Sequence, residues 1–482
     1  MSGMTQRAVI VGGGLAGLAA AVALAERGVS ITVLESRPRL GGRASSFHDK
    51  TSGTHIDNCQ HVNLGCCTNF QHFCRTLGLA DLFRTESELF FIGPDNKVNR
   101  LSAGPMPAPF HCAGSFARLS YLTYSDLVSI AYGLHRLAAA KPDDSRTFLD
   151  WLRGHWQSDT VVERFWTPVL VSALSETLDR IDIASAKKVF LDAFLSNREG
   201  WLVQIPTVPL DQLYGERLLK WLAARGADVR LQAGVERLAI ENGRATGAVL
   251  RSGKIVPADH VIIAVPHWLV LELLPSELRE APQLAKIGGL ESAPISSIHL
   301  WFDRPILFPA RPANPGGNGR DSELPHAVLI GRLSQWVFNR GLLHSTAETG
   351  SSYQVVISAS RNIADWSQQE TIAKVCEELA EIFPRTREAH LLHSRLVTEH
   401  RAVFSNRPGA SDCRAVQQSP VANLQLAGDW TRTGWPATME GAVRSGYLAA
   451  ENVLRALGRP ERVLAPDRPV ALLPRLLLGV NR

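Results

Sequence analysis

The sequence has few cysteines, and their spacing argues against two kinds of stabilising site. Among 482 residues there are seven cysteines, an odd number, and no C-x-x-C pair occurs. A disulfide scaffold is not expected in a chain this long, and the spacings of a zinc site are missing, so no metal is expected. Free thiols fit a reducing compartment, and we therefore expect a cytoplasmic protein.

The sequence also lacks a strong excess of charge of one sign. Lys plus Arg exceed Asp plus Glu by 51 − 46 = 5, and no run of five or more basic residues occurs. A nucleic-acid binder should carry a basic stripe or cluster, so no nucleic-acid partner is expected. Hydrophobic residues form 45% of the chain and charged residues 20%, which excludes a mainly disordered state. At about 150 residues per domain, the length suggests about three domains.

One uninterrupted apolar run, Ala8–Ala25, reaches the lower limit for a membrane span or a signal peptide. It is mostly Ala and Val and holds four glycines in a patterned array. We interpret it instead as a strand at Ala8–Val11, a glycine turn and a helix from Leu15 to about Arg27. A second strand follows at Ile31–Leu34. This βαβ unit predicts a parallel sheet covered by helices.

The glycine turn carries the first functional motif. Gly12-x-Gly14-x-x-Gly17 stands between the strand and the helix. In such a turn the first glycine allows the tight bend, the second lets a pyrophosphate approach the backbone, and the third lets the helix pack on the strand. Glu35 ends the next strand, where a carboxylate can accept hydrogen bonds from ribose hydroxyls. The sequence therefore predicts a dinucleotide-binding site, which leaves NAD(P) and FAD as candidates.

Two further segments indicate which dinucleotide is bound. Residues Glu35–Arg43, with the sequence ESRPRLGGR, resemble the E-x-R-x-R-x-G-G-R segment of the FAD-dependent amine oxidase and carotenoid desaturase superfamily. Leu426–Thr431 and the following helix start at Thr438–Val443 resemble the second FAD motif of that superfamily. The resemblance implies FAD as the cofactor and covers nearly the whole chain. It implies the following cofactor-binding residues: Gly12, Gly14, Leu15, Ala16, Gly17, Glu35, Arg37, Gly42, Arg43, Val235, Gly428, Asp429, Thr438 and Met439.

The resemblance also assigns roles to some of these residues. It implies that Arg43 pairs with a phosphate or the polar edge of the flavin, and that Asp429 binds the ribityl and pyrophosphate region. The backbone at Val235 would hold the adenine. The N–H groups of the helix that begins at Thr438 would face the flavin pyrimidine and stabilise negative charge there.

The expected fold class is α/β, with a Rossmann-type FAD-binding domain, an interleaved α+β substrate domain and a helical insertion. Helical patterns lie near Ser125–Ala140, Thr147–His155 and Val161–Leu174, and Pro309–Ser322 is typical of a flexible loop. The expected parts are a discontinuous FAD-binding domain (1–85, 205–275 and 415–458), a mainly helical insertion (86–204), a substrate domain with a mixed sheet (276–414) and a Pro/Arg/Leu-rich tail (459–482).

Within the superfamily, several segments resemble the hydroxysqualene dehydroxylases of bacterial hopanoid synthesis: Asp57–Val62, Pro105–His111, Gln335–Gly341 and Thr433–Gly441. That resemblance implies reduced FAD replacing the hydroxyl of hydroxysqualene with hydrogen to give squalene. Two positions depart from the family pattern, with Cys59 in place of Gly and Asn339 in place of Asp. A cysteine forced to positive φ would be strained. Thr438 replaces the aromatic residue of amine oxidases, which argues against an amine substrate.

The proposed reaction requires an acid for the leaving hydroxyl and an apolar aromatic pocket that tolerates a carbocation. Asp57 and His61 are the candidate catalytic residues, although Asp57 could instead cap a loop and His61 could be a satisfied buried histidine. The candidate pocket residues are Trp301, Trp336, Phe338 and Trp435, with Phe302 as a further candidate, and each also fits an ordinary core position.

Two other functions stay open at this point. One is oxidative desaturation of a carotenoid-like polyene on the same fold, because the sequence does not decide the direction of electron flow. The other is a non-catalytic isoprenoid-binding partner of neighbouring squalene-pathway synthases. A long-chain isoprenoid substrate implies contact with the inner face of the cytoplasmic membrane. Val463–Val480 could lie on that surface with Arg468 and Arg475 near headgroups, although three prolines disfavour a regular helix and a disordered tail fits equally well.

Overall fold

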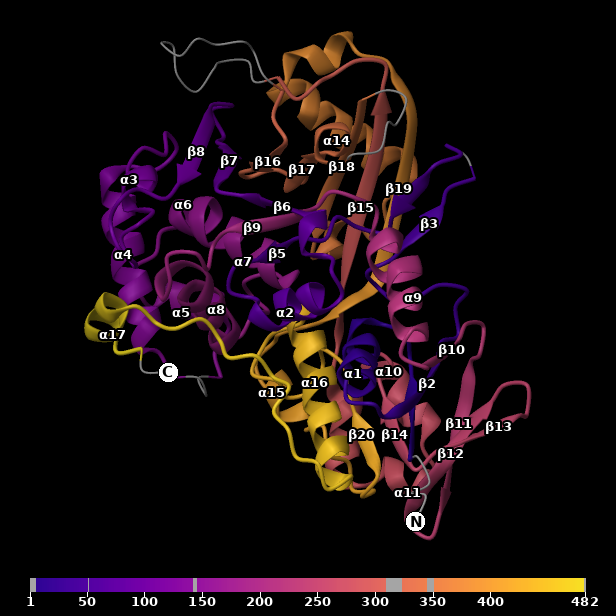
Figure 1. Ribbon diagram of the computed structural model, residues 1–482. Coiled ribbons are helices and arrows are strands. Elements are labelled where there is room, and N and C mark those ends of the chain that lie inside the picture. The colour runs from indigo at the N-terminus through magenta and orange to yellow at the C-terminus, as the bar shows by residue number, and fades with distance from the viewer. Residues whose placement is uncertain (1–5, 51, 142–144, 309–322, 345–350, 481–482) are drawn as a thin grey trace.

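The computed structural model describes residues 6–50, 52–141, 145–308, 323–344 and 351–480. The expected loop at Pro309–Ser322 lies outside the described residues. Figure 1 shows three parts: a parallel sheet with helices beside it at the bottom, a large mixed sheet at the top, and a group of helices at the left. The chain enters each part more than once, so segments far apart in sequence lie side by side.

The lower part is built on a five-stranded parallel sheet with the order β10-β2-β1-β14-β20. These strands are β1 (Arg7–Val11), β2 (Ser30–Leu34), β10 (Asp228–Arg230), β14 (His260–Ile263) and β20 (Leu424–Leu426). Side chains of β1 alternate between two cores: Ala8 and Ile10 face the helices, and Val9 and Val11 face the other side. On that other side lies the antiparallel sheet of β11 (Val235–Glu241), β12 (Arg244–Leu250) and β13 (Ile255–Pro257). The predicted Rossmann-type fold is confirmed.

Helix α1 (Leu15–Ala25) packs against α16 (Met439–Ala456), and both are seen together in Figure 1. Every residue of α1 is buried. A Cβ atom on Gly446 of α16 would lie 2.2 Å from the carbonyl oxygen of Ala16, so the two helices approach at van der Waals distance. This packing explains the long apolar run: its small side chains allow a helix to be buried on all sides. Among the described residues, no helix is long and apolar enough to span a membrane.

The upper part is a seven-stranded mixed sheet with the order β19-β15-β18-β17-β16-β7-β8. Its strands are β7 (Glu88–Ile92), β8 (Val98–Ser102), β15 (Ser292–Phe302), β16 (His326–Leu329), β17 (Trp336–Asn339), β18 (Ser351–Ser358) and β19 (Leu391–Phe404). Helix α14 (Gln368–Ile382) covers one face, where Leu300 and Phe302 meet Val375 and Leu379. Phe302 therefore lies in this core and away from the face that carries Trp301.

Short strands stand at both ends of the segment 86–204, which the sequence predicts to be mainly helical. Its first strands, β7 and β8, belong to the seven-stranded sheet, because β7 pairs with β16 in parallel. At the other end, β9 (Val203–Pro206) pairs with β5 (Asn63–Leu64) and β6 (Phe83–Glu86). These short strands have partners distant in the chain, so the local pattern carries no sign of the pairing.

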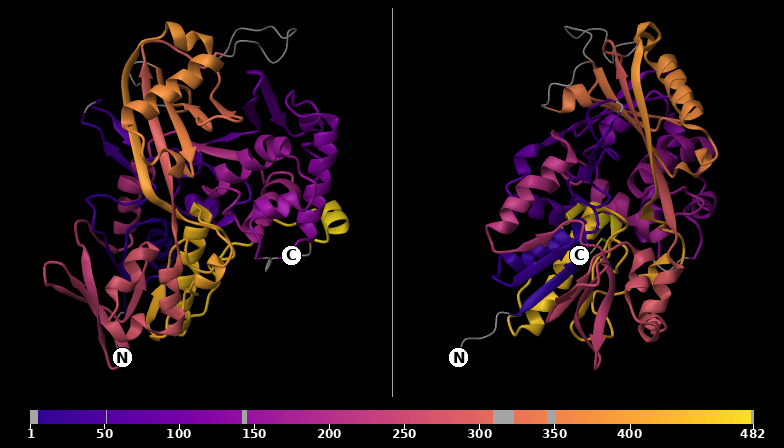
Figure 2. Two further views of the ribbon diagram at one scale, coloured as in Figure 1. Left: turned by 180° about the vertical axis from the view of Figure 1, so that it is seen from behind. Right: turned by 90° about the vertical axis from the view of Figure 1, so that its right-hand side faces the viewer.

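The helices begin after these strands and form the left-hand part of Figure 1. They are α3 (Ala113–Phe116), α4 (Tyr124–Ala139), α5 (Phe148–Arg153), α6 (Asp159–Val161), α7 (Thr167–Leu174) and α8 (Ile183–Val189), with π-helical turns at Val162–Trp166 and Phe190–Leu195. Their core is strongly aromatic, with Phe148, Trp166 and Phe190 all buried. Figure 2 shows that this part also contacts the C-terminal segment, which ends in α17 (Leu472–Leu478).

The C-terminal segment packs against the rest of the fold as far as residue 480, so of the two alternatives for the tail the disordered one does not hold for the described residues. Asn69 Oδ1 accepts from the Ala465 N–H at 2.8 Å, and Asn69 Nδ2 donates to the Ala465 carbonyl oxygen at 3.2 Å. Further on, the Ala471 N–H donates to the Ser196 carbonyl oxygen at 2.9 Å. Pro474 is compatible with α17 because it lies in the first turn, where backbone N–H groups have no helical partner.

Candidate functional site

The glycine turn between β1 and α1 has the geometry that the motif predicts. Gly12 has a φ of +111°, and a Cβ there would lie 2.6 Å from the Ala264 carbonyl oxygen. A Cβ on Gly17 would lie 2.0 Å from the Gly12 carbonyl oxygen. Any larger residue would push the helix away from the strand, so both glycines are required by packing.

Gly14 differs from its neighbours because the space beside it is open. A Cβ on Gly14 would meet only the Cα of Gly42, at 4.0 Å. Gly14 is also the N-cap of α1, and no side chain caps the helix. The first N–H groups of α1, at Leu15 and Ala16, therefore have no side-chain cap and lie at the positive end of the helix dipole. This cradle fits the pyrophosphate of a dinucleotide.

The second glycine pair forms the opposite wall of the cradle. Gly41 and Gly14 form an isolated parallel β-bridge, and the Gly41 N–H donates to the Gly13 carbonyl oxygen at 2.9 Å. Gly41 and Gly42 both have positive φ. A Cβ on Gly42 would lie 3.0 Å from the Gly14 Cα. Two segments that the sequence predicted separately therefore meet at one site.

Glu35 closes the base of this site. Its carboxylate accepts from the Gly13 N–H and from the Arg37 N–H, each at 2.7 Å. The Arg37 side chain turns back to the Gly42 carbonyl oxygen at 3.4 Å. The Ala233 N–H donates to the Glu35 carbonyl oxygen at 2.8 Å, which fixes the start of β11 at Val235 beside this strand end. Glu35 and Val235 therefore lie where the ribose and adenine of the dinucleotide are expected.

The C-terminal motif reaches the same site. The Arg43 Nη2 atom lies 2.6 Å from Asp429 Oδ1, and Asp429 is buried. Arg43 Nη1 also donates to the Ala402 carbonyl oxygen at 2.7 Å. Gly428, with a φ of +148°, has no room for a side chain, because a Cβ would lie 2.2 Å from the Trp430 indole nitrogen. The ion pair of Arg43 with Asp429 thus joins the two predicted FAD segments.

Helix α16 begins at this same site. Thr438 is its N-cap and accepts from the Gly441 N–H at 3.0 Å through Oγ1. Met439 is the first helical residue, and its sulfur contacts the Tyr214 hydroxyl at 4.0 Å. A single side-chain cap leaves other N–H groups of this first turn available to an acceptor. This end of α16 fits the expected contact with the electron-rich edge of a flavin.

Arg414 is a residue at this site that the sequence reasoning missed. Its buried guanidinium donates to the carbonyl oxygens of Asp429 at 3.2 Å, Thr431 at 3.0 Å and Trp435 at 2.7 Å. Burial lowers the pKa of Arg414 to about 10, so it still carries its charge at neutral pH. Arg414 therefore fixes the loop between β20 and α16. No local motif surrounds it, and only its position reveals this role.

The structure assigns Asp57 a set of structural contacts. Asp57 Oδ1 accepts from the Ser46 hydroxyl at 2.6 Å and from the Leu210 N–H at 3.0 Å. Its other oxygen lies 3.6 Å from Arg340 Nη1, and both side chains are buried. The carboxylate thus joins three segments of the fold. These contacts match the loop-capping alternative, and its catalytic role stays a prediction.

His61 lies two residues beyond Cys59 and bonds back to it. The His61 Nδ1 lies 2.9 Å from the Cys59 carbonyl oxygen, so Nδ1 carries a hydrogen and donates. Burial lowers the pKa of His61, which favours the neutral ring. Cys59 is free of positive φ, so the strain expected there is absent. Burial raises the pKa of the Cys59 thiol to about 12, as fits an unreactive side chain.

The other departure from the family pattern, Asn339, has a helix-capping role. Its Oδ1 accepts from the Leu342 N–H at 3.1 Å at the start of α13 (Arg340–Leu343). An aspartate would accept the same hydrogen bond. The substitution therefore leaves this turn intact.

One face of the seven-stranded sheet carries the predicted pocket residues Trp336 and Phe338. Cross-strand pairing aligns His299 with Gln354, Gln354 with Phe338, and Phe338 with His326. The Trp336 and Phe338 rings stack with centroids 4.9 Å apart. Residues in direct register share a face. This row runs across four strands opposite the face that α14 covers.

The aromatic row is joined to the FAD segment through the loop that holds Asp57. His299 Nε2 donates to the Asp57 carbonyl oxygen at 2.9 Å, and burial lowers the pKa of His299 to about 3. The next residue, Asn58, donates from Nδ2 to the Arg43 carbonyl oxygen. One short loop thus spans the distance between the cofactor segment and the aromatic sheet face.

The other two predicted pocket residues lie apart from this row. Trp301 shares the sheet face of His299 and contacts His393, with ring centroids 4.9 Å apart. Trp435 belongs to the core between α1 and α16, and the Lys188 ammonium lies 4.2 Å from its ring centroid. The structure therefore brings Trp336 and Phe338 together and leaves Trp301 and Trp435 at separate positions, and the common pocket stays a prediction.

Several buried nitrogen atoms around the Trp336–Phe338 cluster have no protein hydrogen-bond partner among the described residues. They are the indole nitrogens of Trp201 and Trp336 and both ring nitrogens of His326 and His344. Trp201, Phe338 and Leu343 belong to one core, against which Trp336 and Val62 also pack. Buried polar atoms are normally paired. These nitrogens could pair with a water molecule or with a polar group of a ligand.

Comparison with known proteins shows the family of this chain. The family described as flavin-containing amine oxidoreductases matches residues 15–454 of the chain. A 15-cis-phytoene desaturase of Capsicum annuum is 27% identical, with 95% of this chain and 80% of the relative covered. A probable zeta-carotene desaturase of Synechococcus elongatus is 26% identical, with 93% and 99% covered.

Solved structures show the same fold. An oxidoreductase of Methanosarcina mazei superimposes with a TM-score of 0.69 at 19% identity, covering 91% of this chain and 98% of that one. Cyclohexylamine oxidase of Brevibacterium oxydans also gives 0.69, at 17% identity, with 95% and 100% covered. The family match confirms the predicted flavin cofactor, FAD. Among the described residues, no group of three or more His, Cys, Asp or Glu side chains could hold a metal ion.

Proposed function

Because the chain belongs to the family of flavin-containing amine oxidoreductases, we propose that it is an FAD-dependent oxidoreductase whose substrate is a long-chain isoprenoid polyene. The observation that carries this proposal is the link through Asp57 and Asn58 between the FAD segment at Arg43 and the aromatic sheet face at His299. An apolar, aromatic surface beside a flavin suits a hydrocarbon chain and excludes water.

FAD supplies hydride transfer when it is bound, and this chain supplies its binding and orientation. The N–H groups at Gly14 and the start of α1 would hold the pyrophosphate, and Glu35 would accept from the ribose. Arg43 and Asp429 would hold the phosphate and ribityl regions. The first turn of α16 after Thr438 would stabilise negative charge on the pyrimidine side.

Oxidative desaturation is the reaction that the relatives support. Curated relatives named phytoene desaturase and zeta-carotene desaturase match more than nine-tenths of this chain. In such a reaction the polyene would lose two hydrogens, as a hydride and a proton, and bound FAD would supply the hydride acceptor. The aromatic row of Trp336 and Phe338 would hold the polyene and stabilise positive charge through the ring faces.

Reductive dehydroxylation of hydroxysqualene to squalene is the second candidate, and this chain's own residues support it. A desaturase substrate such as phytoene is a pure hydrocarbon, and it cannot form hydrogen bonds with polar side chains. The unpaired nitrogens of His326, Trp336 and Trp201 fit a substrate that carries a hydroxyl group. In this reaction the allylic hydroxyl would leave as water after protonation, and bound FAD in its reduced form would supply the hydride that replaces it.

A single product assay separates the two candidates. FAD-loaded enzyme is incubated anaerobically with dithionite and hydroxysqualene, and in parallel, oxidised, with phytoene and a quinone acceptor. Dehydroxylation gives a product with one oxygen fewer, and desaturation gives a product that has lost two hydrogens. Formation of neither product would reject the proposed substrate class. A yellow flavin spectrum is expected in either case, and its absence would instead support the non-catalytic isoprenoid-binding role.

The general acid is tested separately. We propose His61 as the candidate, although its lowered pKa makes protonation costly. If His61 acts as the acid, the His61→Ala variant retains FAD but turns over more slowly, with an altered pH profile. Full turnover in that variant would remove His61 from the scheme. The squalene-pathway synthases remain proposed partners, and pull-down with the purified synthases would test them.

A further inference from the structure

Exposed apolar side chains gather at the outer edge of the helical part. We call this surface the α4–α17 face. It consists of Tyr124, Val128, Tyr132, Trp156, Leu472, Leu476 and Leu477. Trp156 is 80% exposed, Leu472 70% and Leu476 71%, which is unusual for large apolar side chains in a folded protein. We propose that this face docks on the surface of an anionic phospholipid bilayer.

The α4 side of the face is built in a fixed geometry. Tyr124, Val128 and Tyr132 follow each other at four-residue spacing and therefore share one face of α4. The Tyr132 and Trp156 rings stack with centroids 5.4 Å apart. The Ser129 hydroxyl donates to the Trp156 carbonyl oxygen at 3.1 Å. Trp156 is thus held outward by its backbone, and the exposed position is a property of the fold.

The α17 side is anchored from beneath. Val470 and Val480 pack with Ala138 of α4 and Leu191 in a small buried core. Leu472 and Leu476 lie four residues apart on the opposite, exposed side of α17. In Figures 1 and 2, α17 lies beside the end of α4 in each view where both are visible. The fold therefore holds a short helix against α4 while its leucines remain outside.

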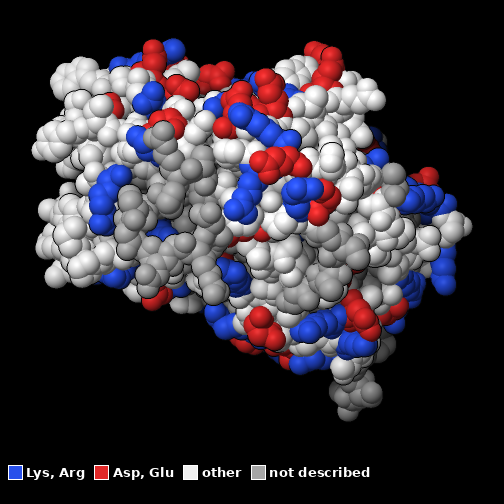
Figure 3. Space-filling model, turned by 90° about the horizontal axis from the view of Figure 1, so that it is seen from above, with Lys and Arg blue, Asp and Glu red and all other residues white. Residues whose placement is uncertain are grey.

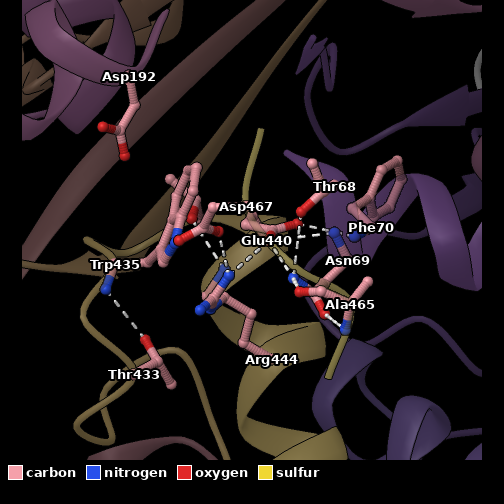
Figure 4. Close-up of polar contacts among 12 residues, drawn as sticks. Thr68, Asn69, Phe70, Asp192, Thr433, Trp435, Glu440, Arg444, Ala465 and Asp467 are labelled. Carbon is pink, nitrogen blue, oxygen red and sulfur yellow. Dashed lines mark hydrogen bonds and ion pairs between the residues drawn. The ribbon is translucent and has the colours of Figure 1, made fainter. Parts of the chain in front are cut away.

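A strap of the C-terminal segment fixes α17 in this place. Figure 4 shows the Arg444 guanidinium between the Glu440 and Asp467 carboxylates, and Arg444 Nη1 lies 2.6 Å from Asp467 Oδ1. Glu440 in turn accepts from the Phe70 N–H at 2.7 Å. Further along, Arg468 Nη1 pairs with Glu199 at 2.6 Å. The segment before α17 is therefore tied to α16, to α2 (Thr68–Thr76) and to the helical part.

Basic side chains lie beside the apolar ones. A cavity of about 320 Å³ opens at the C-terminal end of α4, and its lining includes Trp151 and His155. Arg136 and Lys141 line it, and both are exposed. Asp143 and Asp144 lie outside the described residues. Arg475 of α17 is exposed as well. Exposed Lys and Arg side chains beside an apolar surface attract anionic lipid headgroups.

The combination of aromatic, aliphatic and basic side chains on the α4–α17 face favours a lipid bilayer as the binding partner. Tryptophan and tyrosine prefer the membrane interface, leucines insert below it, and Lys and Arg bind anionic headgroups. In Figure 3 the left-hand end of the molecule, toward α3 and α4, is mostly uncharged, whereas Lys/Arg and Asp/Glu are interspersed over the rest of the view. The proposal widens the sequence expectation, which placed the tail alone on the membrane, and it is independent of the proposed reaction.

The test is cosedimentation of the FAD-loaded, full-length protein with vesicles. Vesicles of equal parts phosphatidylcholine and phosphatidylglycerol should bind the protein, and vesicles of phosphatidylcholine alone should bind it more weakly. Leu472→Ser with Leu476→Ser should lower the partition coefficient roughly tenfold or more, because both leucines leave the apolar layer. Arg136→Gln and Lys141→Gln should each lower it roughly fivefold on the anionic vesicles only.

The matched control replaces exposed apolar residues elsewhere. Leu392, 63% exposed on β19, and Trp366 are changed to serine, and vesicle binding should stay unchanged. Retained flavin absorbance and circular dichroism check that each variant is folded. Equal binding of the Leu472/Leu476 variant and the control would overturn the proposal. Failure of the native protein to bind anionic vesicles would overturn it too. Sedimentation velocity gives a further check: a native dimer that the Leu472/Leu476 variant loses, in a protein that binds no vesicles, would show that the face contacts a second copy of the chain instead.

Discussion

The Arg43 guanidinium and the Asp429 carboxylate, 386 residues apart in the chain, form an ion pair with a 2.6 Å contact. This contact joins the two halves of the proposed cofactor site, because Arg43 belongs to the first predicted FAD segment and Asp429 to the second. Asp429 is buried and Arg43 is half-buried, so the pair is shielded from solvent screening better than a surface ion pair.

Replacement of Arg43 should weaken FAD binding. In Arg43→Gln the Asp429 carboxylate loses its cation, and a charged hydrogen bond of this kind is worth about 1.5–3 kcal/mol. We expect the dissociation constant of FAD to rise roughly 10- to 100-fold, measured by titration of flavin fluorescence. The control is Arg100→Gln, which removes an exposed arginine paired with Glu88 at 3.4 Å. Equal affinity in both variants would contradict a role of Arg43 at the cofactor.

Replacement of Gly446 should separate α1 from α16. A Cβ in Gly446→Ala would lie 2.2 Å from the Ala16 carbonyl oxygen, so the helices must move apart. Overpacking of this kind costs about 1–3 kcal/mol of the free energy of unfolding, measured by urea denaturation. Gly114→Ala is the control, because Gly114 is also helical and has nothing within 4 Å of the added atom. A loss of stability in Gly114→Ala as large as in Gly446→Ala would refute this account.

Replacement of Arg414 should loosen the loop before α16. Arg414→Met leaves the buried carbonyl oxygens of Asp429, Thr431 and Trp435 without their donor. Each unpaired buried acceptor costs about 1–3 kcal/mol, so thermal stability and FAD affinity should both fall clearly. The control is the neighbouring Arg432→Met, because Arg432 is exposed. If Arg432→Met were the more damaging change, the role assigned to Arg414 would be wrong.

Stability should fall in mild acid because buried histidines must remain neutral. Burial lowers the pKa of His326 to about 4, whereas an unfolded histidine titrates near 6.5. Between about pH 6.5 and pH 4, His326 is protonated in the unfolded chain but stays neutral in the folded chain. The free energy of unfolding therefore falls with pH, by at most about 1.4 kcal/mol per pH unit for this residue, until pH approaches the folded pKa.

Urea unfolding between pH 7 and pH 5 measures this dependence. His326→Phe, which keeps an aromatic ring among Phe90, Trp336 and Phe338, should flatten the profile. The exposed His390 supplies the control variant His390→Phe, whose profile should match that of the native protein. An unchanged slope in His326→Phe would show that other groups govern the acid sensitivity.

Local sequence patterns were sufficient to predict the glycine turn and the helix cap of the proposed dinucleotide site. Gly12 and Gly17 are fixed by backbone geometry within one βαβ unit, and their roles follow from spacing alone. The same holds for the cap at Thr438, where the hydroxyl and the helix that it starts are three residues apart. Such short-range relations are determined by the chain itself, whatever surrounds it.

Tertiary structure decided the features that depend on distant partners. Asp57 stood out in sequence as a candidate acid, but Ser46, Leu210 and Arg340 meet it only in the folded chain. Arg414 has no local motif, since its acceptors lie on a loop 15 to 21 residues away. The strands β7 and β8, the docked segment before α17 and the row of Trp336 and Phe338 likewise depend on pairing across the fold. Spacing determines backbone turns and caps, whereas burial and long-range pairing determine which side chains remain free for chemistry.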